Sequence, residues 1–272
     1  GVPSEITLVR NRSYTLGAPH LHRLVIKVFA NQQTLEEALI SNSIDFTIEM
    51  LPSTLAQSTS QSTHKSVLIP SENIVGVYRH IENSPLSSIS LLDILNRYID
   101  RKAITDTVDN GYGIPYVSEV DTSGTASLEE TLLALNSLGY NVTNGVLTKG
   151  GSPVVLSIAT LSDNRLVATA QELAKQLASI GVIFEIKAFD SGTFQDELTR
   201  EAFSLVLTNG KDRLPHRYSK GIPLYQDATL LVTNEKAKGI APSALDSPTL
   251  RYATINTWHE RTEHLYRWFT KQ

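Results

Sequence analysis

The chain has 272 residues, of which 41% are hydrophobic and 19% charged, and its formal net charge is −4. These values are typical of a globular protein with one large domain or two smaller ones, and the acidic balance argues against a nucleic-acid partner, which needs a basic surface. The absence of cysteine excludes disulfides, thiolate metal sites and cysteine nucleophiles.

The N-terminal part of the chain alternates strand and helix patterns. Strands are predicted at residues 6–10, 24–29 and 44–50, from alternating polarity or a high content of β-branched side chains. Apolar residues at helical spacing predict a helix over residues 34–40, with Thr34 as N-cap and Glu37 completing a capping box. We expect the two strands that flank this helix to pair in parallel. The Ser-, Thr- and Gln-rich residues 53–66 predict a surface loop or linker.

The central part of the chain contains the longer elements. Strands are predicted at residues 67–77, 154–159, 182–188 and 203–208, and helices at 90–108, 127–138, 166–180 and 194–200. Ser127 and Glu130 have the spacing of a capping box, and Gly139 and Gly181 are predicted to end their helices. From residue 154 onward the alternation of strands and helices is typical of a parallel sheet covered by helices.

The C-terminal part has a different character. Residues 224–233 are predicted to be extended, and an aromatic-rich helix is predicted over residues 258–269. We expect this helix to pack on the rest of the protein; contact with a membrane surface is the alternative. No apolar run approaches the ~20 residues that span a bilayer.

Four stretches of the sequence, taken in order and with their spacing, point to one family. They are residues 6–14 with 24–29 and 38–45; residues 84–86 with 99–104; residues 132–140 with 149–153; and residues 170–182 with 203–207. Together they resemble family 5 of the extracellular solute-binding proteins, which bind oligopeptides, dipeptides or nickel for ABC importers. Arg12 departs from the family pattern, which usually has Pro there, and the long segment that normally separates residue 207 from residue 222 is missing.

The resemblance implies an α/β fold of the two-lobed, periplasmic-binding-protein-like kind (type II), with one lobe incomplete. We expect residues 1–66 and 225–272 to form the first, partial lobe and residues 67–224 to form the second α/β lobe. Solute would be held between the lobes, and a hinge would let them close on it.

The function implied by the resemblance is extracytoplasmic binding of a solute for an ABC-type import system, and not catalysis. The implied partners are a peptide or other small solute and the permease subunits of the transporter. The implied location is the periplasm or cell surface, with membrane association only through an anchor that this chain lacks. The alternative is an interaction or structural domain, derived from such a protein, that has lost ligand binding; an unrecognised hydrolase is a third hypothesis.

Two places in the second lobe are candidate ligand contacts. Tyr78, Arg79 and His80 end a predicted strand where the family often has Gly-Phe-Asn. Arg79 has the fork geometry that meets a carboxylate through two parallel hydrogen bonds, and a solvated strand end is the alternative. Asn209 follows the strand over residues 203–208, and open α/β sheets bind ligands at the carboxyl ends of strands. Asn-Gly is, however, also a common turn sequence.

Three further motifs are set aside. Asp100-Arg101-Lys102 belongs to the family signature, and we interpret it as a local structure at a helix end. His259 and His264 are five residues apart, which takes the second His off the helical face that a zinc site needs. The Asp-Thr-Ser-Gly stretch at Asp121 lacks the partner loop of a two-carboxylate mechanism. We therefore predict no catalytic residue, metal site or cofactor.

Overall fold

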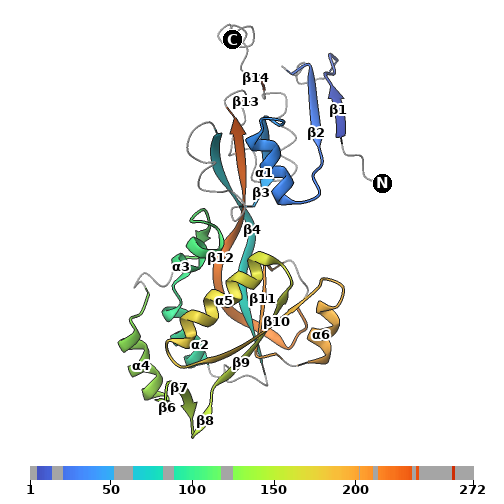
Figure 1. Ribbon diagram of the computed structural model, residues 1–272. Helices are drawn as coiled ribbons and strands as arrows, with labels where there is room; N and C mark the ends of the chain where they lie inside the picture. The colour runs from blue at the N-terminus through green and yellow to red at the C-terminus, as the bar shows by residue number, and fades with distance from the viewer. Residues whose placement is uncertain are drawn as a thin grey trace. The chain divides into compact units, whose positions relative to one another are not determined.

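The computed structural model describes residues 5–13, 21–51, 64–81, 89–117, 125–201, 203–210, 214–234, 237–238 and 259–260. The chain divides into two compact units, one of Gly1–Ser71 with Ala228–Gln272 and the other of Glu72–Asp227. Strands β4 (His64–His80) and β12 (Tyr218–Asn234) each contain one of the two boundaries (Figure 1). The predicted boundaries, at 66/67 and 224/225, lie a few residues away, and the identity of the units as two lobes stays a prediction.

The first unit contains a two-stranded antiparallel sheet of β1 (Glu5–Val9) and β2 (Arg23–Lys27). Helix α1 (Gln32–Ile40) follows, and β3 (Phe46–Met50) pairs in antiparallel fashion with β12. The predicted parallel pairing of the strands on either side of α1 is therefore wrong. Each strand has a different partner, because β1 forms a hairpin-like ladder with β2 and a strand about 180 residues further on supplies the partner of β3.

Helix α1 begins earlier than the capping-box pattern predicted. Its N-cap is Asn31, whose Oδ1 accepts a hydrogen bond from the Thr34 amide at 2.9 Å. Thr34 lies inside the first turn, where its hydroxyl donates to the Asn31 carbonyl oxygen at 3.0 Å. Asn caps a helix at least as well as Thr, so the earlier residue takes the position.

The second unit is built on a twisted sheet whose strand order is β10-β9-β11-β4-β12, with β5 pairing to β12. Strands β9 (Val155–Leu161), β10 (Ile183–Phe189) and β11 (Leu205–Thr208) are parallel, as predicted. Strand β4 runs antiparallel to β11, and the short β5 (Ile114–Pro115) runs antiparallel to β12. A separate sheet contains β6 (Tyr140–Thr143), β7 (Val146–Lys149) and β8 (Ser152–Pro153).

Five helices of this unit are described. They are α2 (Ile89–Tyr98), α3 (Arg101–Val108), α4 (Leu128–Ser137), α5 (Asn164–Ala178) and α6 (Phe194–Arg200). The single helix predicted over residues 90–108 is thus wrong and is replaced by α2 and α3. The chain breaks at Asp100, whose carboxylate caps a new helix by accepting from the Ala103 amide at 2.9 Å. The capping box of Ser127 and Glu130 is confirmed.

Both faces of the parallel strands are covered. One face carries the larger core cluster, in which Leu156 and Ile158 of β9 pack with Leu173 of α5. The opposite face carries a smaller cluster, in which Ala159 of β9 packs with Phe194 of α6. Adjacent residues of β9 point to opposite faces, which is why one strand supplies both clusters. Figure 1 shows α5 along the strands of the sheet and α6 to their right.

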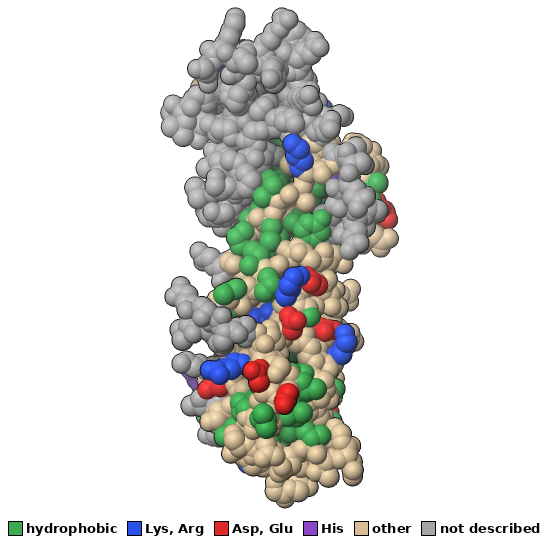
Figure 2. Space-filling view, turned by 90° about the vertical axis from the view of Figure 1, so that its left-hand side faces the viewer, with side chains coloured by type: hydrophobic (Ala, Val, Ile, Leu, Met, Phe, Trp, Pro, Cys, Tyr) green, Lys and Arg blue, Asp and Glu red, His purple; other side chains and the backbone are tan. Residues whose placement is uncertain are grey.

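The surface of the described residues mixes both signs of charge. Figure 2 shows Lys and Arg side chains interspersed with Asp and Glu on the face drawn there. The ion pairs Lys187–Glu201 and Lys102–Asp106 illustrate this mixing. In the described part of the chain, no helix combines the length and apolar character needed to cross a bilayer. The helix predicted over residues 258–269 falls outside the described residues, except that His259–Glu260 form strand β14, paired with β13 (Ala237–Lys238).

Candidate functional site

The carboxyl ends of the three parallel strands meet at one edge of the second unit. In the β11–β4 ladder, the last residue of β11, Thr208, lies opposite Gly76. The next turn brings Gly210 close to β4, since a Cβ on that glycine would lie 3.5 Å from the Ile74 carbonyl oxygen. Open α/β sheets bind ligands at this edge, so a ligand site in the second unit is expected here.

A hollow of about 400 Å³ lies at this edge of the second unit. We call it the edge pocket, and its lining residues are Ile74, Ile114, Pro115, Tyr116, Val117 and Gln226. One wall is β5, which pairs with β12 through Ile114 opposite Gln226 and continues in a bond from the Tyr116 amide to the Leu224 carbonyl oxygen at 3.0 Å. An apolar lining with a few polar groups is the usual character of a small-ligand site.

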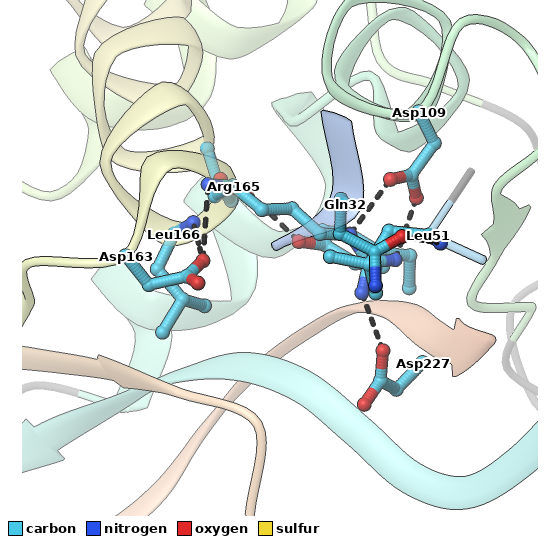
Figure 3. Close-up of polar contacts among 9 residues, drawn as sticks. Gln32, Leu51, Asp109, Asp163, Arg165, Leu166 and Asp227 are labelled. Carbon is cyan, nitrogen blue, oxygen red and sulfur yellow. Dashed lines mark hydrogen bonds and ion pairs between the residues drawn. The ribbon is translucent and has the colours of Figure 1, made fainter. Parts of the chain in front are cut away.

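A buried ionic cluster, drawn in Figure 3, includes Asp227, which directly follows the lining residue Gln226. Arg165, in the first turn of α5, donates from Nε and Nη2 to the two carboxylate oxygens of Asp109, both at 2.7 Å. Its Nη1 donates to Oδ1 of Asp227 on β12. The exposed fractions of the side chains are 8% for Arg165, 0% for Asp109 and 16% for Asp227. Burial alone would lower the pKa of Arg165, but the bonds to its two carboxylates outweigh it and raise that pKa.

Tyr225 extends the cluster along β12. Its hydroxyl lies 2.9 Å from the Thr169 hydroxyl of α5, and its ring centroid lies 4.9 Å from the Arg165 guanidinium carbon. Burial raises the pKa of the Tyr225 phenol, and the nearby Arg165 only partly opposes that rise. The phenol is therefore neutral at physiological pH. Its hydrogen bond with Thr169 connects the part of β12 that lies in this unit to α5.

The predicted ligand contacts lie together only in part. Tyr78 and Arg79 are opposite Val206 and Leu205, at the amino end of β11. The Tyr78 hydroxyl nevertheless reaches the turn after β11, since a Cβ on Gly210 would lie 3.9 Å from it. His80 is only 3% exposed, and its ring packs edge-on against Tyr218 at a centroid distance of 5.2 Å. Asn209, in contrast, follows β11 at the carboxyl edge, on the side of the edge pocket. A ligand-binding role for these four residues stays a prediction, and Asn209 has the position that best fits it.

The structural interpretation of Asp100 and Arg101 is confirmed. Besides the cap made by Asp100, Arg101 Nε donates to the Pro223 carbonyl oxygen at 2.8 Å and Nη2 donates to the Asn96 side chain at 2.5 Å. These bonds join α3 to the preceding helix and to β12. Within the described residues no group of three His, Asp or Glu side chains is placed to hold a metal ion.

Neither the ionic cluster nor the edge pocket was predicted from the sequence. A signal existed for one of the charges, because Asp227 interrupts the apolar run around Leu224 and Leu230 that predicted a strand. A charged side chain within a buried strand needs a partner, so the position of Asp227 alone could have predicted that an oppositely charged residue lies nearby. The partner's identity could not be read in the same way, since Arg165 is 62 positions from Asp227 and 56 from Asp109 in the sequence.

Comparisons with known proteins give one consistent result. Residues 2–228 match the family described as bacterial extracellular solute-binding proteins, family 5 Middle. Comparison with curated proteins gives no match. The α/β, periplasmic-binding-protein-like fold predicted from the sequence is confirmed by the similarity to solved structures.

Three of these structures illustrate the similarity. The oligopeptide-binding protein AppA from Bacillus subtilis, solved with a nonapeptide, has a TM-score of 0.60 at 15% identity, over 96% of this chain and 65% of that chain. NikA from Brucella suis, solved with Fe(III)-EDTA, has a TM-score of 0.73 at 11% identity, over 95% of this chain and 66% of that chain. The ABC transporter substrate-binding protein CtaP from Listeria monocytogenes has a TM-score of 0.71 at 15% identity, over 95% and 64%. The chain thus spans less than two thirds of the length of these structures.

Proposed function

The chain belongs to family 5 of the bacterial extracellular solute-binding proteins, and we propose on this basis that it binds a peptide for an ABC-type import system. The proposal includes an extracytoplasmic location, at the periplasm or cell surface, and delivery of the solute to permease subunits of the transporter. It treats the two compact units as the two lobes of a binding protein, and it assigns no catalytic activity to the chain.

The edge pocket is the structural observation that supports this proposal. Its place at the carboxyl edge of parallel strands is where open α/β folds bind ligands. Its lining is mixed: apolar side chains such as Ile74 and Ile114 suit a peptide side chain, while the Tyr116 and Gln226 side chains have polar groups that suit the peptide backbone or bridging water. The relative from Bacillus subtilis, solved with a nonapeptide, makes peptide the first ligand class to test.

A thermal-shift titration tests the proposal directly. Mixed di- to pentapeptides at millimolar concentration should raise the melting temperature, because a ligand that binds only the folded state stabilises it by RT ln(1 + [L]/Kd). At a peptide concentration about 100 times Kd the gain is about 2.7 kcal/mol, or several degrees for a chain of this size. The absence of any shift would contradict autonomous peptide binding and favour an interaction domain that has lost its ligand.

A pair of matched variants tests the location of the site. Val117→Trp places a bulky ring in the lining of the edge pocket at a side chain that is 78% exposed, so the fold should tolerate it. Leu133→Trp makes a similar change on α4, at a side chain that is 66% exposed. We expect Val117→Trp to abolish the peptide-induced shift and Leu133→Trp to keep it. Equal shifts in both variants would place the ligand outside the edge pocket.

A further inference from the structure

The two walls of the edge pocket are each joined to the ionic cluster. On β12, the lining residue Gln226 is followed directly by Asp227, which bonds Arg165. On the other wall, Gly113 precedes the lining residue Ile114 and packs against Asp109, since a Cβ on Gly113 would lie 2.7 Å from Asp109 Oδ2. One guanidinium therefore bonds the carboxylates that support both walls.

The position of Arg165 is itself fixed from several sides. The helix that carries it is capped by Asp163, whose Oδ1 accepts from the Arg165 amide at 3.0 Å. The Arg165 carbonyl oxygen accepts from the Thr169 hydroxyl at 2.8 Å, and the same hydroxyl bonds Tyr225 of β12. Because its side chain is only 8% exposed and does not line the pocket, Arg165 is placed to support a site without contacting what the site binds.

We propose that Arg165 is a positioning residue for the edge pocket, which fixes the spacing of β5 and β12 by bonding Asp109 and Asp227 at the same time. The inference rests on the proposed function only for the statement that the pocket binds solute. The planar guanidinium suits this task, because it has enough donors in fixed directions to bond one carboxylate through two atoms and a second through another. A lysine at this position would supply the charge without this geometry.

Asp227→Ala is the variant that tests the proposal most cleanly. It removes the acceptor on β12 and leaves the two bonds between Arg165 and Asp109 in place, whereas a neutral residue at 165 would strand a buried carboxylate and endanger folding. The reporter is the Tyr116 amide, which bonds the Leu224 carbonyl oxygen across the ladder of β5 and β12. Hydrogen exchange at this amide measures local separation of the two walls and needs no ligand.

We expect Asp227→Ala to accelerate exchange at Tyr116 by about tenfold or more, because it removes a hydrogen bond between charged groups, which contributes at least that factor. The Ile183 amide, which bonds the Val154 carbonyl oxygen beside β9 and β10, should change by less than about twofold. As a matched control, Glu201→Gln breaks the exposed ion pair with Lys187 and should leave Tyr116 unchanged.

Two results would overturn the proposal. Unchanged exchange at Tyr116 in Asp227→Ala would show that the bond does not hold the two strands together, and equal acceleration at Tyr116 and Ile183 would show a general loss of stability with no local role. Peptide binding is measured separately, so a failure of peptides to bind the unaltered protein removes the proposed function and leaves this result standing. Selective acceleration at Tyr116 supports the positioning role whether or not the solute is a peptide.

Discussion

At the scale of single residues, the helix starts of this protein depend on a few side-chain hydrogen bonds. In the capping box of α4, Glu130 Oε2 accepts from the Ser127 amide at 2.8 Å and from the Ser127 hydroxyl at 2.9 Å. In return, Ser127 Oγ accepts from the Glu130 amide at 3.2 Å. The backbone bond, followed by the hydroxyl bond, favours the carboxylate form and lowers the pKa of Glu130 below its ordinary value of 4.5.

This lowered pKa predicts a pH dependence with a defined sign. Since the folded pKa lies below the unfolded one, Glu130 stabilises the fold fully above about pH 4.5, and this stabilisation is lost as pH falls through the folded pKa. Stability of the unaltered protein should therefore decrease more between pH 6 and pH 3 than that of Glu130→Gln, measured by urea unfolding. Parallel pH profiles for the two proteins would contradict the assignment, and Glu129→Gln, one residue away in the same turn, is the matched control.

Residue patterns with a local mechanism were predictable, and those with distant partners were not. The capping box at Ser127 and the helix-ending Gly139 and Gly181, with φ of 80° and 82°, were predicted because each depends on neighbours within a few residues. The bonds of Arg165 join residues more than 50 positions apart. No short sequence pattern predicts bonds between such distant residues, so the ionic cluster of Arg165 was not predicted.

At the scale of elements, the break between α2 and α3 shows that a side-chain cap can start a new helix where the apolar spacing alone would continue the previous one. An uninterrupted helix was predicted from the apolar spacing of residues 90–108, yet Asp100 turns the chain and caps α3. The break is fixed by α5, because Gln176 bonds both the amide and the carbonyl oxygen of Asp100, at 2.9 and 3.1 Å. Tertiary contacts therefore stabilise a boundary that helix propensity alone does not predict.

Substitution of the cap measures this boundary. Asp100→Ala should lower the free energy of unfolding by about 1 kcal/mol, the usual loss when a helix cap is removed. Asp100→Asn should stay close to the unaltered protein, because an amide oxygen also accepts from the Ala103 amide. The measurement is the midpoint of urea unfolding. If Asn were as damaging as Ala, the negative charge and not the cap would be the stabilising feature.

Strand existence was more predictable than strand pairing. The parallel order of β9, β10 and β11 followed from their regular alternation with helices. The pairing of β3 with β12 could not be predicted in this way, because the sequence of either strand alone does not indicate a partner so far along the chain. The same limit explains the edge pocket, whose walls come from β4, β5 and β12 and are brought together only by sheet topology.

At the scale of the whole molecule, the second unit is a continuous segment with its own core. Both of its hydrophobic clusters are made entirely from residues 72–227, as is the ionic cluster of Arg165. A domain of ~150 residues with such a core is large enough to fold alone. The first unit, in contrast, is assembled from two separate segments of the chain.

A fragment of residues 72–227 should therefore unfold cooperatively in urea, with a slope of roughly 1–3 kcal/mol/M. Within it, Leu173→Ala should lower stability by about 2–5 kcal/mol, because that side chain is fully buried in the core; a loosely packed fragment would not respond. The fragment 67–224, which follows the predicted boundaries, loses buried Tyr225 and one of the two carboxylates of Arg165. Its midpoint should be clearly lower, and equal midpoints would show that the end of β12 adds nothing to this unit.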